Sequence, residues 1–328
     1  MFRKIFIVAM VLFILTGCSA PVTPTNPPTA TPLVHVKLPM GYIPNVQYAP
    51  FYVAIERGYF KEKGIEIEFD YSSETDGVSL VGANKLQFAV VSGEQVLLAR
   101  AQNLPVVYVA AWYQKYPVSI ISMAANNIKS PMDLRGKKIG LPGLYGASYI
   151  GLRALLYAAG IQEKDTTLDS IGYNQVEILA TGHEDAVVGY AANEPVLLRS
   201  KGYAINEMRV SDFVQLASNG IITNETTIAQ NPDLVRNFVS AFRQGLQDTI
   251  NDPDTAYDIS TKYVDNLKQA DPIVQKQILG TSIELWRAPV LGQSDATAWE
   301  NMQKVLLDMK LYTDPLDLKK AFTNEFIQ

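Results

Sequence analysis

Strand-like and helix-like segments alternate along this chain from residue 34 to about residue 202, and this alternation restricts the fold more than any other feature. The stretch VHVKLPM (34–40) alternates as a strand does, residues 49–63 show helical spacing, and IEIEF (65–69) alternates again. Further strand-like and helix-like segments follow in the same order. Such an order predicts parallel strands in a sheet with helices on both of its faces.

The alternation runs twice before the chain becomes almost wholly helical. Further strands are expected at 88–92, 105–113, 118–123, 137–142, 168–173 and 186–190. Helices are expected between them at 76–82, 93–102, 147–159, 176–181 and 193–202, and then at 233–251, 256–266, 272–285 and 294–309. We predict an α/β fold with two lobes, the first comprising 34–118 and 220–328 and the second 119–219. The crossings between the lobes are expected near 114–124 and 214–226.

The N-terminal residues have the pattern of an export signal. Arg3 and Lys4 precede an apolar run (5–16) that is too short to span a bilayer. The run ends at LTGC (15–18), which resembles the lipobox of bacterial lipoproteins. We therefore expect a signal peptide at 1–17, a lipid on Cys18, and a Pro/Thr-rich tether at 18–33. An ordinary secretory signal with a chance cysteine is the alternative.

Several function classes are disfavoured by what the sequence lacks. Cys18 is the only cysteine, so no disulfide is expected, and the net charge of −5 with no basic cluster argues against nucleic acid. His35 and His183 lack metal-ligand spacing, and GLPGLYGAS (140–148) lacks the end of a P-loop. No catalytic triad pattern occurs. We expect no metal, no cofactor and no enzymatic activity.

Polar and aromatic residues gather where strands are expected to give way to helices, which is where open α/β sheets bind ligands. Four junctions have this character: 41–52, 92–94, 143–148 and 190–194. Any one of them, taken alone, is better explained by ordinary turn and cap residues, and the case for a site rests on all four falling on one expected edge. The candidate ligand-binding residues are Asn45, Tyr48, Ser92, Glu94, Trp112, Tyr113, Tyr145, Gly146, Ser148, Tyr190, Asn193 and Glu194. Tyr157 and Phe88 are expected in the core, and Trp286 in the core or in a pocket wall.

Three stretches together resemble a known family. GYIPNVQYAPFYVAIERGYFKEKGIEIEF (41–69), SPMDLRGKKIGLPG (130–143) and DAVVGYAANEPVLL (185–198) are similar to the thiamine-pyrimidine-precursor type of ABC-importer binding protein. The group also holds sulfonate and nitrate binders, and the resemblance covers nearly all of 34–328. It implies a type II periplasmic-binding-protein fold whose lobes close on a small molecule. It also implies a membrane permease as partner and a place on the extracytoplasmic face of a bacterial membrane. We expect a monomer.

The resemblance also bears on the ligand. It implies that the Asn45 and Tyr48 positions contact an aromatic ligand, but Tyr48 stands where pyrimidine binders commonly carry a histidine. The enzyme branch of the family has an active-site histidine and a cysteine-rich motif, and this chain has neither. No arginine pair is placed to clamp a sulfonate.

The candidate residues suit a flat heterocycle, because tyrosine and tryptophan rings stack on such a molecule while Asn and Glu meet its polar edges. We prefer a flavin such as riboflavin, with a thiamine pyrimidine precursor (of the formylaminopyrimidine or hydroxymethylpyrimidine type) as the alternative. A sulfonate binder and a pyrimidine-synthesising enzyme are lesser alternatives.

The lipid anchor yields a direct test. Metabolic labelling with a fatty acid should mark the wild-type protein, and the label should disappear in Cys18→Ala because the acceptor thiol is gone. A wild type that takes up no label would remove the lipoprotein assignment.

Overall fold

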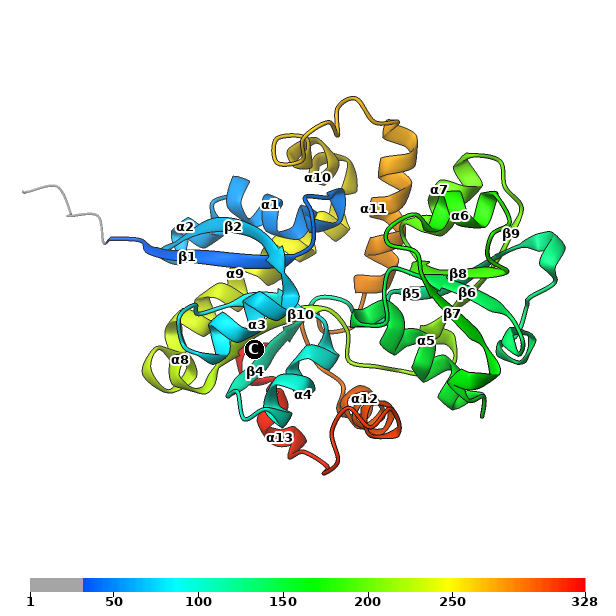
Figure 1. The fold of residues 1–328 in the computed structure, drawn as a ribbon. Helices are drawn as coiled ribbons and strands as arrows, with labels where there is room; N and C mark the ends of the chain where they lie inside the picture. Colours follow the sequence, from blue (N-terminus) through cyan, green and yellow to red (C-terminus); the bar gives the residue numbers. More distant parts are fainter. Residues whose placement is uncertain (1–31, 328) are drawn as a thin grey trace, which may run out of the picture. The chain divides into compact units, whose positions relative to one another are not determined.

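The computed structural model describes residues 32–327, and from Leu33 onward these form one compact unit. Their strands form three sheets flanked by helices (Figure 1). The expected signal peptide, the lipidated Cys18 and all but the last two residues of the expected tether lie outside the described residues. Within the described range, no helix is long and apolar enough to cross a membrane.

The first sheet is a parallel pair of strands, β1 (Val34–Gly41) and β2 (Ile65–Ser73). The connection between them consists of η1 (Val46–Tyr48), α1 (Ala49–Glu56) and α2 (Tyr59–Glu62). The expectation of one helix over 49–63 is therefore wrong. Gly58 has a φ of +79°, a left-handed conformation that suits glycine and interrupts the helix.

The second sheet has three strands in the order β3 (Ala89–Val91), β10 (Gly220–Asn224), β4 (Val106–Ala111). The central strand β10 returns from the far part of the chain and runs antiparallel to both neighbours. The expectation of a purely parallel sheet fails here, because a late strand inserts between two early ones. Two helices follow the early strands of this region: α3 (Glu74–Gly82) and α4 (Gly93–Ala101).

The third sheet has five strands in the order β7-β6-β8-β5-β9. They are β5 (Val118–Met123), β6 (Lys138–Leu141), β7 (Thr167–Ser170), β8 (Ala186–Tyr190) and β9 (Ile205–Arg209). β6 is parallel to β7 and β8, whereas β5 is antiparallel to β8 and β9. The helices of this region are α5 (Gly146–Ala158), α6 (Gln175–Ala180) and α7 (Glu194–Ser200). Strand β9 was not expected from the sequence.

The C-terminal part is helical, as expected. Its helices are α8 (Glu225–Gln230), α9 (Pro232–Asn251), α10 (Pro253–Ser260), α11 (Pro272–Trp286), α12 (Ala296–Asp308) and α13 (Leu318–Ala321). The remaining short 3₁₀ turns are η2 (Ala124–Asn126), η3 (Pro131–Leu134), η4 (Glu163–Asp165), η5 (Val210–Asp212) and η6 (Glu325–Ile327). The expected helix at 256–266 ends earlier, at Ser260, and the short α8 and α13 were not expected.

Two segments link the second sheet to the third (Figure 1). Residues 112–117 lead from β4 to β5, and residues 210–219 lead from β9 to β10. The backbone N–H groups of Trp112 and Tyr113 both donate to the Asn219 carbonyl, at 3.1 and 2.9 Å. The ranges expected for the crossings, 114–124 and 214–226, include β5 and β10 themselves, so the actual links are shorter and lie earlier.

Large apolar side chains pack the core between helices and sheets. On α9, Phe238 and Phe242 lie on one buried face at helical spacing, and Phe238 stacks on Phe88 with ring centroids 4.0 Å apart. Each such fully buried ring contributes about 2 kcal/mol to folding. Phe88 is thus a core residue as expected, and Trp286 is fully buried. Tyr157, in contrast, is 48% exposed, so its expected core placement is wrong.

The close approach of α9 to α1 gives a stability prediction. A Cβ added at Gly245 on α9 would overlap the Pro50 carbonyl oxygen and would lie 2.7 Å from the Cβ of Ala54. Gly245→Ala should therefore lower the free energy of unfolding by about 1–3 kcal/mol, despite the better helix propensity of alanine. Gly280→Ala on α11 is the matched control, because no atom lies within 4 Å of its added Cβ.

In chemical denaturation, the Gly280→Ala control should gain about 0.5–1 kcal/mol. Equal effects of the two substitutions would contradict the packing described for α9 and α1.

Candidate functional site

A cavity of about 310 Å³ lies where the ends of several strands and the two linking segments meet. Its walls come from the end of β1 and η1, the start of α3, the loop before α5, the loop before α6, and the junction of β8 with α7. Its floor contains Trp112 and Tyr113 from one linking segment and Asn219 from the other. The cavity size is within the range of small-molecule sites.

Most of the candidate residues from the sequence surround this cavity. Those that line it are Tyr48, Trp112, Tyr113, Tyr145, Gly146, Ser148, Tyr190, Asn193 and Glu194. Asn45, Ser92 and Glu94 are not among its lining residues. The Asn45 side chain accepts the Gln47 backbone N–H at 3.0 Å and caps η1, while Ser92 and Glu94 are fully buried behind the wall.

The inner part of the cavity is aromatic. The ring of Tyr48 lies 5.5 Å from that of Trp112, and Tyr113 is 5.0 Å from Trp112 on another side. Trp286 lies 5.6 Å behind Trp112 and does not line the cavity, so it belongs to the core. The Tyr48 hydroxyl donates to the Met40 carbonyl at 2.8 Å, which fixes the ring. The Trp112 Nε1–H is buried without a hydrogen-bond partner.

Three more tyrosines lie at the outer part of the cavity. Tyr145 and Tyr173 are 69% and 67% exposed, and Tyr42 lies 5.7 Å from Tyr173, ring to ring. The Tyr145 loop turns into α5 at Gly146, whose φ of +67° favours glycine. Exposed aromatic rings at a cavity opening are free to cover a flat ligand.

The charged side chains that line the cavity are acidic. They are Glu74 and Glu194, and no Lys, Arg or His among the described residues lines the cavity beside them. Burial raises the pKa of the Glu194 carboxyl to about 7, and the backbone N–H of Tyr190 donates to its Oε2 at 2.7 Å. Burial, with the nearby Glu94 charge, raises the pKa of Glu74 to about 8.

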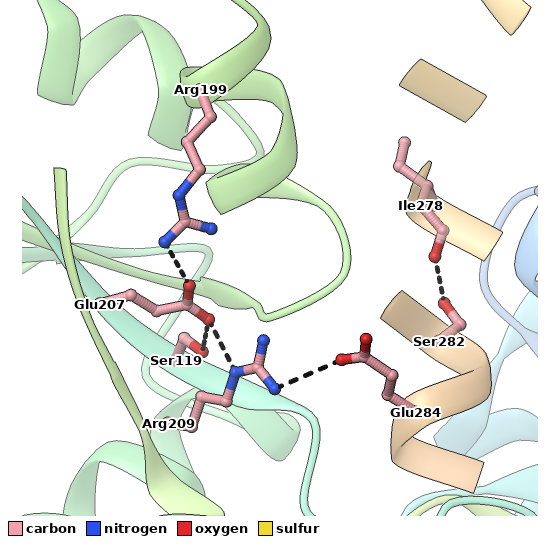
Figure 2. Close-up of polar contacts among 7 residues, drawn as sticks. All are labelled: Ser119, Arg199, Glu207, Arg209, Ile278, Ser282 and Glu284. Atoms are coloured by element: carbon pink, nitrogen blue, oxygen red, sulfur yellow. Dashed lines mark hydrogen bonds and ion pairs between the residues drawn. The ribbon is translucent and has the colours of Figure 1, made fainter. Parts of the chain in front are cut away.

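Polar contacts also join the segments on either side of the cavity. Gln47 donates to the Ser282 hydroxyl on α11 at 3.1 Å, and Asn193 donates to Gln47 at 3.5 Å. Ser282 in turn donates to the Ile278 carbonyl at 2.9 Å (Figure 2). Gln47 of η1, the N-cap residue Asn193 before α7, and Ser282 of α11 are thus connected in one chain of hydrogen bonds.

A second polar link is centred on Glu207 of β9 (Figure 2). Its carboxylate accepts from Arg199 at 2.7 Å and from both Ser119 and Arg209 at 3.1 Å. Arg209 also lies 3.9 Å from the exposed Glu284 on α11. An exposed pair at this distance contributes little to stability, so the contact between α11 and the five-stranded sheet is weak here.

Several cavity residues were missed by the sequence analysis. They are Met40, Gly41, Tyr42, Gln47, Ser73, Glu74, Thr75, Val90, Gln95, Pro142, Ala147, Tyr173, Gln175 and Asn219. The same junction rule would have found Glu74, because it follows β2 directly, had the strand been extended from Phe69 to Ser73. Tyr42 lies within the first junction, and its aromatic character was the available signal. Asn219 carried no local signal.

The comparison with known proteins now identifies the family. The family model described as NMT1/THI5 like matches residues 45–256 of the 328. The chain belongs to the NMT1/THI5-like family. The match includes the first linking segment and most of the residues that line the cavity.

Two curated relatives share nearly the whole chain. The chain is 40% identical to the riboflavin-binding protein RibY of Chloroflexus aurantiacus, with 97% of this chain and 95% of the relative aligned. It is 27% identical to the formylaminopyrimidine-binding protein of Halalkalibacterium halodurans, over 97% of this chain and 98% of that one. Both relatives are binding proteins by name.

Solved structures identify the fold. The periplasmic aliphatic sulphonate binding protein SsuA of Escherichia coli superposes with a TM-score of 0.72 at 13% identity, covering 88% of this chain and 92% of its own. The family member described here thus has the periplasmic-binding-protein fold, as the sequence resemblance implied.

Proposed function

We propose that this protein is a lipid-anchored, extracytoplasmic solute-binding protein of an ABC importer, and that its ligand is a neutral aromatic heterocycle, with riboflavin preferred. The observation that carries the proposal is the cavity, where tyrosine and tryptophan rings occur together with amide and carboxyl groups and, within the described part of the chain, without a basic side chain. Flat rings stack on such side chains, and Asn, Gln and Glu pair with the ring edges.

The relatives support the preference for riboflavin over a pyrimidine. The protein with 40% identity is named as a riboflavin binder, and the one with 27% identity as a formylaminopyrimidine binder. A tricyclic ring also has more surface for Tyr42, Tyr145 and Tyr173 to cover than a single pyrimidine has. A thiamine pyrimidine precursor stays as the alternative ligand.

The lesser alternatives lack supporting groups. A sulfonate carries a fixed negative charge, which two cavity carboxyls and no basic residue would disfavour. A pyrimidine-synthesising enzyme of this family is expected to need a histidine and cysteines. Tyr48 occupies the histidine position, and Cys18 is the only cysteine. We infer that the protein binds its ligand without transforming it and needs no cofactor.

We further propose that residues 34–118 with 220–328 act as one lobe and 119–219 as the other, hinged at the two linking segments. A ligand that touches Tyr48 and Glu74 on one side and Tyr145, Asn193 and Glu194 on the other would favour the closed state by its differential affinity. The few polar contacts between α11 and the five-stranded sheet are weak enough to permit such a movement. The closed monomer would then deliver its ligand to a membrane permease.

The ligand assignment predicts a visible result. Protein purified with riboflavin should be yellow and should quench flavin fluorescence. Tyr145→Ala and Tyr173→Ala should each weaken binding about 3–10-fold, because each removes an aromatic contact of about 0.5–1.5 kcal/mol. These exposed rings can be removed without opening the core.

Tyr157→Ala is the matched control, because the Tyr157 ring is also exposed but does not line the cavity. This variant should bind riboflavin with the same affinity as the wild type. A colourless protein whose melting temperature rises with a pyrimidine precursor would reject the flavin and keep the binding-protein role.

A further inference from the structure

Three oxygen atoms form an unusually short chain in the cavity wall. The Ser92 hydroxyl lies 2.5 Å from Glu74 Oε2 and 2.6 Å from Glu94 Oε1. Glu74 begins α3, Ser92 follows β3, and Glu94 lies in the first turn of α4, so three elements bring these groups together. A serine hydroxyl has only one proton to donate.

Two ionised carboxylates cannot both be satisfied by that one proton. If Ser92 donates to Glu94, the contact with Glu74 places two oxygens at 2.5 Å and requires a proton on Glu74. If Ser92 donates to Glu74, the proton is required on Glu94. Either arrangement gives the cluster one proton more than two carboxylates would hold, and a total charge of −1 rather than −2.

Among residues 32–327, no Lys, Arg or His lines the cavity beside Glu74 to remove this requirement. Tyr48 of η1, Tyr116 of the first linking segment, Tyr173 of the loop before α6 and Tyr190 of β8 all face Glu74 electrostatically. Burial raises the pKa of each of these phenols above its usual value, so all four stay neutral near pH 8. On its own helix Glu74 is joined by the exposed Asp76, another acid.

Two buried polar atoms near the cluster have no hydrogen-bond partner, and the one on Trp112 belongs to the cavity lining. The first is Glu94 Oε2, which belongs to a fully buried side chain behind the cavity wall. The Trp112 Nε1–H is likewise unpartnered, and Trp112 lines the cavity that Glu74 also lines. The wall is therefore adapted to a molecule that brings hydrogen bonds and not a charge.

We propose that Glu74, Ser92 and Glu94 form a shared-proton site through which Glu74 offers a neutral carbonyl oxygen to a ring N–H of the ligand. In this arrangement Glu74 Oε2–H donates to Ser92, and Ser92 donates to Glu94. The other oxygen, Oε1, is left on the side of Gly41, which lines the cavity and whose added Cβ would lie 3.4 Å from it. The ligand class is a neutral heterocycle with a ring N–H.

The proposal links ligand binding to a proton. A neutral ligand that covers Glu74 removes the water that would solvate a carboxylate, so binding favours the protonated cluster. Burial and the Glu94 charge already raise the pKa of Glu74 to about 8 in the free protein. Affinity should therefore weaken above pH 8, where the free protein loses this proton, in addition to any change near pH 7 caused by Glu194. This ligand-facing part rests on the function proposed above, whereas the shared proton itself does not.

The ligand-free arm of the test is infrared spectroscopy at pH 7. The wild type should show protonated-carboxyl absorption with a component that is lost in both Glu74→Gln and Glu94→Gln, because a glutamine amide donates to Ser92 in place of the acid, while the contribution of Glu194, whose pKa is about 7, remains. Glu62→Gln, at an exposed acid of α2, is the control and should keep this component. Variants whose carboxyl region equals that of the wild type would overturn the shared proton.

The ligand arm measures riboflavin affinity by fluorescence quenching at pH 6.5 and pH 9. The affinity of the wild type for riboflavin should be about tenfold lower at pH 9 than at pH 6.5. Glu74→Gln should bind at pH 6.5 within about threefold of the wild type and lose the weakening above pH 8, because Gln copies the neutral acid, whereas the dependence near pH 7 that Glu194 causes should remain. A wild-type affinity independent of pH, or loss of binding in Glu74→Gln, would overturn the role of Glu74. If the wild type binds no riboflavin, the proposed function fails, and the infrared spectra still decide the shared proton.

Discussion

The backbone contact between the two linking segments is the constraint on which the rest of the site depends. The Asn219 carbonyl accepts from both Trp112 and Tyr113, so the first segment is fixed to the second at the floor of the cavity. From the other side, the Leu285 carbonyl at the end of α11 accepts from Gln114 and Lys115 at 2.9 and 3.1 Å. These bonds determine where the rings of the floor stand. They also join segments that are far apart in the sequence.

A second constraint is electrostatic. Burial without a nearby cation makes the ionised form of a carboxyl costly and therefore raises its pKa. Glu74, Glu94 and Glu194 all show this shift, with burial as its main cause. A cavity of this kind disfavours anions and suits an uncharged molecule that has hydrogen-bond donors at its edge. The aromatic rings around it suit the flat faces of the same molecule.

Local patterns predicted much of the secondary structure, but sheet order depends on contacts that are distant in sequence. The strand expected at 186–190 is β8, and the helix expected at 272–285 is α11 with one more residue. Strand β9 was not predicted because its sequence, INEMR, is polar. The strand is held in place mainly by pairing with β5. The insertion of β10 between β3 and β4 could not be read locally, because each strand looks the same wherever it pairs.

For the candidate site, too, local patterns found some residues, whereas others depend on contacts that are distant in sequence. The junction rule gathered Tyr48, Tyr145 and Tyr190 correctly around one cavity, because strand ends meet at one edge. It placed Glu94 at the cavity, whereas Glu74, which is joined to Glu94 through Ser92, is the residue that lines it. It could not find Asn219, whose place depends on a linking segment that returns from β9. Tyr157 was assigned to the core from its spacing on α5, but its side of the helix is half exposed.

The most direct measurement of the central claim is a crystal structure of the protein grown with riboflavin. The account predicts the flavin ring in the cavity, against Tyr48 and Trp112, with a ring N–H within hydrogen-bond distance of Glu74. A flavin bound elsewhere on the surface, or a cavity that holds it with its ring away from both the aromatic floor and Glu74, would contradict the account.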